Sequence, residues 1–215
     1  MNTQFSLDSV MKSIEQGGLT LITGCNATGK TAFAVQLAIK AGLDDKKSVL
    51  LFNTSLNKGD VLSRMLSPLS KIELSRLLKG GLDQEEHKKL FNEAGKLAKA
   101  SIFMDDSQDV TVTGILNKVN LLNQANSKID LVIIDDVCAI NPWNKQVVDE
   151  LKEQLCDKGI ALVLLALQQY EFVKANKTLT LEREGAVVNV SINQEGEKFN
   201  NVMHLRFIAE YGSLA

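Results

Sequence analysis

The feature that most constrains this chain is a short glycine-containing segment between an apolar run and a helical pattern. Leu19–Thr23 are five β-compatible residues, and residues 24–31 read Gly-Cys-Asn-Ala-Thr-Gly-Lys-Thr. They match G-x-x-x-x-G-K-[ST], the pattern of a phosphate-binding loop between a strand and a helix. Residues 30–41 have the apolar spacing of a helix, and Gly42 is expected to end it. An accidental glycine-rich turn is the alternative, and the flanking strand and helix argue against it.

The loop suits a polyphosphate ligand for physical reasons. Gly24 and Gly29 let the backbone approach the phosphates closely and adopt the unusual dihedral angles that this requires. The start of the following helix adds free N–H groups and the positive end of the helix dipole. Lys30 is expected to reach the β and γ phosphates, and the Thr31 hydroxyl to ligate Mg²⁺. The predicted nucleotide-binding residues are Gly24, Cys25, Asn26, Ala27, Thr28, Gly29, Lys30 and Thr31.

Length, charge and cysteine content narrow the class of protein. A chain of 215 residues is long enough for one sizeable core, and we expect a single domain over residues 1–215. The net charge of -2 provides no overall basic field that would attract nucleic acid.

The three cysteines are odd in number and widely spaced, which suggests free thiols in a reducing cytoplasm. The longest apolar run, residues 160–167, is too short to span a bilayer, and the first residues lack the layout of a signal peptide, so we expect a cytoplasmic protein without membrane contact.

Apolar strands and amphipathic helices alternate along most of the chain, which predicts an α/β fold with a mainly parallel sheet flanked by helices. Continuous apolar runs of the kind buried in a parallel sheet lie at residues 48–52, 101–104, 131–136 and 160–167. Near the C-terminus the pattern changes to short strands separated by turn residues, at 179–181, 186–192 and 202–209. We therefore expect a small antiparallel extension at the end of the sheet.

The predicted helices follow from apolar periodicity and from start signals. They cover residues 6–14, 59–66 and 113–125, with a further helix around 147–155. Ser70 and Glu73 match a capping box at the start of another helix, which Gly80-Gly81 would end. Asp83 and Glu86 repeat the start signal for a helix whose inward residues are Leu90, Phe91, Ala94 and Leu97.

A phosphate loop needs a carboxylate that orients Mg²⁺, usually at the end of a neighbouring apolar strand. Asp135 fits because four aliphatic residues precede it, and the C-terminal edge of that strand is also where the loop lies. A helix N-cap or a solvated strand end is the alternative role. Asp136 is a candidate second acid, although neighbouring strand residues point to opposite faces and this favours solvent for it.

Other polar residues at strand ends have weaker signals. Asp105-Asp106 could line the same edge or serve in a turn or N-cap. Gln168 and Gln169 end the strand at 160–167, where an amide could sense the γ-phosphate or simply terminate the strand. Trp143 lies in a loop from which it could stack on a base, although a packed loop tryptophan is the commoner outcome.

The order of the elements and the short motifs within them resemble one family, the C-terminal RecA-type ATPase domain of DnaB-family replicative helicases. Besides the loop, the matching stretches are residues 5–8, 49–52, 62–66, 81–83, 102–107, 132–135, 166–169 and 205–207. The resemblance implies a RecA-like P-loop NTPase fold, in which Lys30 and Thr31 hold ATP and Mg²⁺. It further implies that Asp135 is the Walker B acid and that Gln169 is the γ-phosphate sensor. Single-stranded DNA, a homo-oligomer or a replication-protein partner are the contacts that it suggests.

The chain also departs from this family. Family members carry a catalytic glutamate just after the second strand, where this sequence has Ser55, and a serine cannot serve as the general base at neutral pH. A Lys-x-Arg pair, whose arginine reaches the neighbouring subunit's site, corresponds to Lys198-Phe199-Asn200, so that Asn200 replaces the arginine. The DNA-contacting loop after Gln169 is shortened, with residues 181–185 as its remnant. We expect no counterpart of the family's N-terminal domain and linker helix.

Two functions are therefore open at the level of sequence. One is a DnaB-like ATPase in DNA replication or recombination, with weak or partner-dependent ATP hydrolysis. The other is a catalytically degenerate adaptor or regulator that binds ATP or ADP and has no helicase activity.

Overall fold

A computed structural model describes residues 10, 14, 16–107, 110–125, 127–194 and 197–214, with only the backbone of residues 197–202. The helix predicted over residues 6–14 lies outside this part of the chain except at Val10 and Ile14, which are both buried. The strands form a 9-stranded sheet in the order β3-β2-β4-β5-β1-β6-β7-β8-β9. Their bounds are β1 Leu19–Thr23, β2 Val49–Asn53, β3 Ile102–Asp105, β4 Leu131–Asp135, β5 Ala161–Ala166, β6 Lys177–Glu184, β7 Val187–Gln194, β8 Glu197–Ile208 and β9 Ser213–Leu214.

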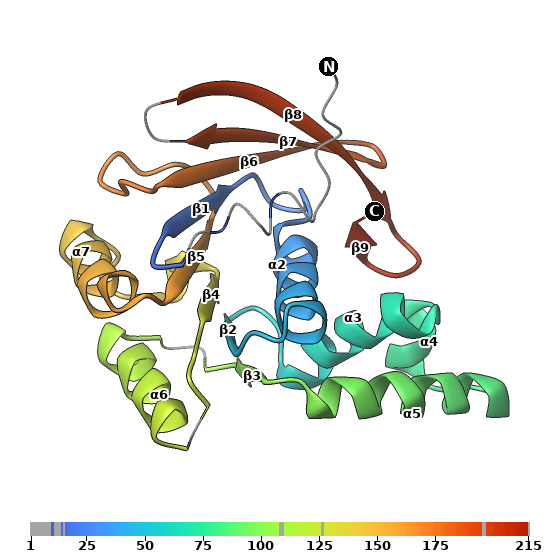
Figure 1. Cartoon of the computed structure of the whole chain (residues 1–215). Coiled ribbons are helices and arrows are strands. Elements are labelled where there is room, and N and C mark those ends of the chain that lie inside the picture. Colours follow the sequence, from blue (N-terminus) through green and yellow to red (C-terminus); the bar gives the residue numbers. More distant parts are fainter. Residues whose placement is uncertain are drawn as a thin grey trace.

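The strand pairings agree with the predicted layout. β3, β2, β4, β5, β1 and β6 pair in parallel, whereas β6–β7, β7–β8 and β8–β9 pair antiparallel. The antiparallel strands form the long curved extension at the top of Figure 1. The fold is therefore the RecA-like α/β arrangement expected from the sequence. Two details differ within the described residues: β6, predicted as part of the antiparallel extension, also pairs in parallel with β1, and the short strand β9 was not predicted.

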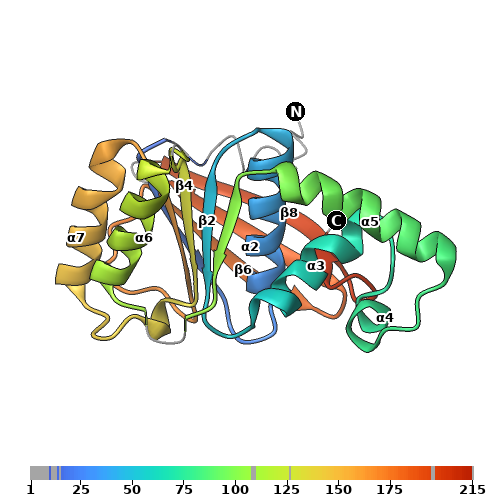
Figure 2. The ribbon, with the colours of Figure 1, turned by 90° about the horizontal axis from the view of Figure 1, so that it is seen from below.

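Helices cover both faces of the parallel strands. Their bounds are α2 Lys30–Ile39, α3 Lys58–Ser70, α4 Leu74–Lys79, α5 Gln84–Lys99, α6 Val112–Gln124 and α7 Lys145–Gln154, with short η1 Lys40–Asp44, η2 Val137–Ala139 and η3 Cys156–Lys158. Figure 2 shows α6 and α7 on one side of the sheet and α2, α3 and α5 on the other. Among the described residues, no helix is both long and apolar enough to cross a membrane.

Alternation along the strands divides the interior into two apolar cores. Leu51 and Ile133 belong to the core under α2 and α3, whereas Leu50 and Ile134 belong to the core under α6 and α7. Successive strand residues point to opposite faces, so a central strand covered on both sides must be apolar at every position. This explains why the parallel strands appear in the sequence as continuous apolar runs.

Three predicted helix features are wrong. Gly42 does not end the first helix, because the chain continues through it in the π-helical turn Lys40–Asp44. Ser70 is the last residue of α3 rather than the start of α4, and its hydroxyl donates back to the Leu66 carbonyl at 2.7 Å. Phe91 does not face inward, since it is 72% exposed.

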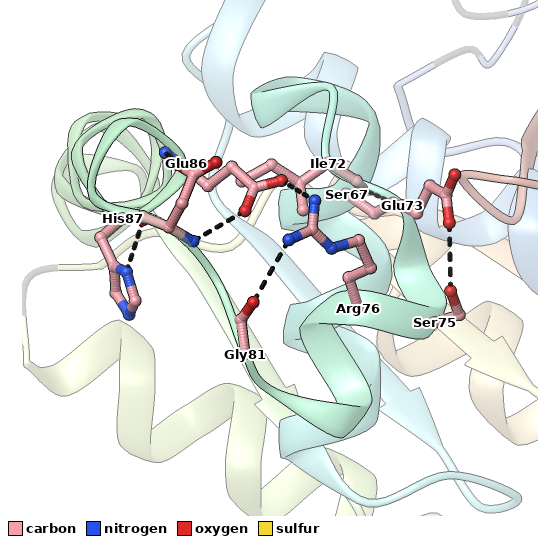
Figure 3. A network of polar contacts seen from close by, with 9 residues as sticks. Ser67, Ile72, Glu73, Ser75, Arg76, Gly81, Glu86 and His87 are labelled. Carbon is pink, nitrogen blue, oxygen red and sulfur yellow. Dashed lines mark hydrogen bonds and ion pairs between the residues drawn. The ribbon is translucent and has the colours of Figure 1, made fainter.

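The predicted start of α5 is confirmed, and it is tied to α4 by an arginine (Figure 3). The Glu86 N–H donates to Asp83 Oδ1 at 2.8 Å and the Asp83 N–H donates to Glu86 Oε2 at 2.9 Å, which completes a capping box. Arg76 on α4 forms an ion pair with Glu86 and donates to the Gly81 carbonyl at 3.2 Å. These contacts hold α4 and the intervening turn against the first turn of α5.

Candidate nucleotide-binding site

The candidate site lies at the C-terminal edge of the parallel strands. The phosphate loop follows β1, and Asn53 and Asp135 end β2 and β4, which pair in parallel at these residues. A pocket of about 310 Å³ opens at this edge. Its lining includes Lys30, Thr31, Ser55, Arg64, Asp135 and Asp136. The fold therefore gathers the loop, the acid and a further cation from separate stretches of the chain.

Two glycines give the loop its shape. A Cβ at Gly24 would lie 2.7 Å from the Leu181 carbonyl oxygen and 2.7 Å from Thr28 Oγ1, so no larger residue fits there. Gly29 caps α2 with a φ of 99°, in the left-handed region that favours glycine. The first N–H groups of α2 have no side-chain cap, and Lys30, Thr31 and Ala32 of this first turn line the pocket.

Lys30 is held at the mouth of the loop. Its side chain is buried with the residue only 8% exposed, and its ammonium donates to the Gly24 carbonyl at 2.7 Å and to the Cys25 carbonyl at 2.9 Å. An ammonium group has three donors, so one stays available to a ligand. A cation fixed over the loop N–H groups is suited to a polyphosphate.

Asp135 is the buried acid of the pocket, at 4% exposure. Asn53 Nδ2 donates to Asp135 Oδ2 at 2.9 Å. Burial raises the pKa of Asp135 to about 6, a hydrogen bond with the Thr31 side chain opposes this rise, and the nearby negative charge of Asp136 adds to it. The charges on Lys30 and Arg64 also lower this pKa, so the acid lies within the field of both cations.

These residues fit Mg²⁺ bound together with nucleotide phosphates. Among the described residues, no group of three or more His, Cys, Asp or Glu side chains could hold a metal ion by itself. Mg²⁺ typically takes one or two protein carboxylates and completes its shell with phosphates and water. The Thr31 hydroxyl and the Asp135 carboxylate, joined by a hydrogen bond, provide oxygen ligands of that kind.

Of the remaining predicted site residues, Asp136 lines the pocket and Gln169 does not. Asp136 was expected to face solvent, but it is half-buried and lines the pocket, and its carboxylate accepts from the Cys138 N–H at 3.0 Å. Gln169 lines a separate hollow beside β6, with Thr178 and Asn193, so its role as a γ-phosphate sensor stays a prediction.

Asp105, Asp106 and Trp143 have structural partners. Asp105 forms an ion pair with Lys118 at 3.2 Å, and Asp106 pairs with Lys58 at 3.1 Å. Trp143 packs against Tyr170 and Phe172, each with a ring centroid 6.0 Å away. Trp143 is thus the packed loop tryptophan of the commoner expectation.

Comparison with known protein families identifies the family of the chain. The model of the DnaB-like helicase C-terminal domain matches residues 1–169. The chain belongs to this family.

Several relatives support this assignment. The replicative DNA helicase DnaB of Buchnera aphidicola is 23% identical over 217 residues, which cover 97% of this chain and 46% of the helicase. DnaB of Pasteurella multocida is 27% identical over 132 residues, which cover 60% of this chain and 28% of the helicase. The chain thus spans less than half the length of these DnaB relatives.

Solved structures share the fold. A DnaB-like replicative helicase, described with its interactions with primase, matches with a TM-score of 0.81 at 19% identity, covering 94% of this chain and 58% of that chain. A solved ATPase domain matches with the same score and identity, covering 94% of this chain and 85% of that chain. At this identity the likeness concerns the fold alone.

The departures predicted at Asn200 and in residues 181–185 lie beyond residue 169, the last residue that the family model matches, so both stay predictions. Asn200 is in β8, in the part described by its backbone alone, so its side chain lies outside the described residues. Residues 181–185 are the end of β6 and the first residue of the turn into β7, and they lie beside the phosphate loop.

Sequence reasoning missed two arginines of this DnaB-like pocket. β6 pairs with β1 only up to Thr180, so residues 181–184 extend beyond β1 alongside the loop. There Arg183 donates to the Ala27 carbonyl at 3.2 Å and lies 4.1 Å from the centroid of the Phe207 ring. Arg64 lies on α3, between the buried residues Val61 and Met65. Arg64 falls within residues 62–66, one of the stretches that resemble the DnaB family, but its spacing alone does not assign it to the pocket.

Proposed function

We propose that residues 1–215 form one RecA-like domain that binds ATP with Mg²⁺ in this pocket and acts in DNA replication or recombination. The observation that carries the proposal is the convergence of Lys30, Thr31 and Asp135 on one pocket at the end of β1 and β4. Lys30 would bind the β and γ phosphates, and Thr31 and Asp135 would ligate the metal. The bound Mg²⁺ would neutralise charge on the phosphates.

We further propose that ATP hydrolysis is weak or depends on a partner. Ser55 lines the pocket at the position of the family's glutamate, and a neutral serine hydroxyl does not accept a proton from water at neutral pH. Asp136 lines the same pocket and is the remaining candidate for a base. Its carboxylate already accepts the Cys138 N–H, which fixes its orientation.

The alternative is a nucleotide-binding adaptor or regulator that does not hydrolyse ATP. The exposed Ser55 beside an intact set of binding residues favours it. As an adaptor, the protein would make different contacts with a protein partner when it binds ATP and when it binds ADP, and it would have no helicase activity. Both functions require the protein to bind ATP, and they differ in whether it hydrolyses the bound ATP.

The partners of the chain follow from its relatives. DnaB relatives are named replicative helicases, and one solved relative is described with primase. Single-stranded DNA, further copies of this chain and a replication protein are therefore the partners that we propose, within the cytoplasm. The mild net charge of -2 means that DNA binding would depend on local cations.

Calorimetry with Mg²⁺ and either ATP or ADP tests the binding. Lys30→Ala should weaken binding by at least about tenfold, because a charge-assisted hydrogen bond contributes about 1.5–3 kcal/mol. Lys145→Ala is the matched control, since Lys145 lies on α7 with an ion pair to Asp149 outside the pocket. Absence of binding by the wild-type protein would refute the proposal.

ATP turnover, with and without single-stranded DNA, separates the two functions. Ser55→Glu should raise turnover, because general-base catalysis contributes a factor of about 10²–10⁴. Turnover of the wild-type protein that DNA stimulates and that Lys30→Ala removes would exclude the adaptor. Binding without turnover in the wild-type protein, followed by turnover in Ser55→Glu, would exclude the motor.

A further inference from the structure

The strand β9 is a two-residue element that packs on the helix of the nucleotide site. Among the described strands it pairs only with β8, at Phe207 and Ile208, and it lies below the end of β8 in Figure 1. Its residues Ser213 and Leu214 are each only 4% exposed. A short strand that is paired on one side belongs to the least stable parts of a fold. Its position therefore depends on the contacts that these two residues make.

Leu214 bridges two turns of α2. A Cβ at Gly29 would lie 3.7 Å from Leu214 Cδ2, so the leucine side chain lies against the last glycine of the phosphate loop. Gln36 Nε2 donates to the Leu214 carbonyl at 2.5 Å. Gln36 follows Gly29 by about two helical turns, so both residues are on one face of α2. One residue of β9 is thus attached to the helix at its start and again two turns later.

The Gln36 side chain makes this attachment at the expense of the core. Its Oε1 is buried and has no hydrogen-bond partner among the described residues. A buried amide oxygen without a partner lowers stability, whereas an apolar side chain of similar volume would not. The neighbouring residues Val35 and Leu37 are apolar and buried. A glutamine at this position therefore serves the bond to β9 rather than the stability of the core.

Packing against Leu214 restricts Gly29 before a ligand arrives. Gly29 has a φ of 99°, and glycine loses more conformational freedom than any other residue when it is fixed. Phe207 Cδ2 and Val188 Cγ2 complete the wall, at 3.9 and 4.0 Å from the same Cβ position. A loop that is already restricted to the shape in which it binds has a higher affinity, because less entropy is lost on binding.

The turn before β9 has an attachment of its own. The Leu74 N–H at the start of α4 donates to the Glu210 carbonyl at 2.8 Å. Within the turn, the Tyr211 N–H donates to the Ile208 carbonyl at 3.2 Å, and Gly212 has a φ of 59°. Opening of β9 can therefore stay local and leave β8 in place.

We propose that Leu214 is a positioning residue of the nucleotide site. With β9 docked on α2, Leu214 holds Gly29 in the conformation that binds phosphate, and bound nucleotide in turn holds β9 in place. Leu214 does not line the pocket and acts through Gly29. The inference rests on the proposed function and adds a regulated element to that site. Because such coupling is reciprocal, the factor by which docking strengthens binding is also the factor by which nucleotide disfavours opening.

Hydrogen exchange measured by mass spectrometry tests the coupling in the wild-type protein. Saturating ADP with Mg²⁺ should slow exchange in a peptide that covers β9 by about tenfold, a usual size for coupling between two sites. The last turn of α6, residues 121–124, is outside the pocket and should exchange at an unchanged rate. A strand with a structural role alone would not respond to nucleotide in this way.

Variants test the same coupling from the other side. Leu214→Ala should weaken binding of ADP with Mg²⁺ by about 5- to 20-fold in calorimetry, and Leu214→Met, of similar volume, should keep most of the affinity. Gln36→Leu should weaken binding by about 2- to 10-fold through the loss of one hydrogen bond. It should not lower the midpoint of urea denaturation, because it also removes a buried oxygen without a partner among the described residues.

Leu122→Ala is the matched control, because Leu122 is 9% exposed and lies in the core under α6 and α7. This variant should lose stability and keep its affinity for ADP. If Leu214→Ala folds poorly, Gln36→Leu and the exchange of the wild-type protein still decide the question.

Three results would overturn this inference alone. They are exchange of β9 that saturating nucleotide does not slow, an unchanged affinity in both Leu214→Ala and Gln36→Leu, and an equal loss of affinity in Leu122→Ala. A wild-type protein that binds neither ATP nor ADP would refute the proposed function as well.

Discussion

Replacing Asp135 by asparagine should stabilise the protein while removing its use of Mg²⁺. The side chain is 4% exposed, and burial raises the pKa of Asp135 from its ordinary value of 3.8 to about 6. Each unit of pKa corresponds to about 1.36 kcal/mol, so the ionised carboxylate lowers the free energy of unfolding by about 3 kcal/mol at pH 7. Asparagine has nearly the same shape and carries no charge.

The hydrogen bonds around position 135 suit this substitution. Asn53 Nδ2 donates to the Asp135 carboxylate at 2.9 Å, and the amide oxygen of an asparagine accepts the same bond. Its amide nitrogen can donate to the Thr31 hydroxyl, which accepts as readily as it donates. We therefore expect most of the roughly 3 kcal/mol to be recovered in Asp135→Asn, measured by urea denaturation without nucleotide.

The pH dependence identifies the cause. Because the pKa of Asp135 is higher in the folded state, the folded protein holds a proton that the unfolded chain has lost between pH 3.8 and 6, and its stability falls as pH rises through this range. The advantage of Asp135→Asn should therefore decrease from about 3 kcal/mol at pH 7 to roughly half at pH 5 and to a few tenths of a kcal/mol near pH 3.8. An advantage that does not change with pH, or a less stable variant at pH 7, would refute the reasoning. The same variant should lose Mg²⁺-dependent ATP binding, because the carboxylate proposed to ligate the metal is gone. A group that is needed for binding would then be one that lowers the stability of the folded protein.

Two further predictions concern the scaffold. Gly42→Ala should lower the free energy of unfolding by about 1–3 kcal/mol in urea denaturation, because the added Cβ would lie 2.3 Å from Ile102 Cγ1; a more stable variant would mean that the π-helical turn relaxes freely. Asp83→Ala should cost about 1 kcal/mol in the same assay through the loss of the capping box with Glu86, and Glu85→Ala, at an exposed position of the same turn, should cost less than half as much.

The parts of the fold set by local pattern could be predicted from the sequence. The runs that became β2, β4 and β5 are buried at every position, and this composition identifies strands of a parallel sheet. The phosphate loop has a fixed spacing, and the capping box at Asp83 and Glu86 lies within four residues. Each signal is complete within its own segment of chain.

The wrong predictions arose where tertiary contacts decide between two uses of a residue. Gly42 matched a helix stop, yet it lacks a side chain because Ile102 of β3 lies against the helix there. Ser70 and Glu73 matched a capping box, but the Ser70 hydroxyl bonds back within α3 and Lys71, with a φ of 56°, ends that helix. Phe91 lies next to the partly buried Leu90 and falls just outside the inward stripe of α5.

The arginines of the pocket could not be predicted because they depend on distant elements. Arg183 reaches the loop only because β6 pairs with β1 and continues past its end, a pairing across more than 150 residues of sequence. Arg64 becomes a pocket residue through the packing of α3 under the sheet. Arg64 lies in the family-like stretch 62–66 and Arg183 in residues 181–185, but neither local pattern indicates a position beside the phosphate loop.

The two proposed functions, an ATP-hydrolysing motor and a nucleotide-binding adaptor, differ in what they require of one exposed side chain, that of residue 55. Asn53 donates to Asp135 through Nδ2, and its Oδ1 accepts the N–H groups of Ser55 at 3.2 Å and Leu56 at 2.7 Å. One buried amide thus fixes the backbone of residue 55 relative to Asp135, the proposed metal ligand, whatever side chain residue 55 carries. Since Ser55 is exposed, a glutamate there would need no desolvation and would project from an already positioned backbone. The backbone of residue 55 is therefore already positioned relative to Asp135, so Ser55→Glu is the variant that most directly distinguishes the two proposed functions.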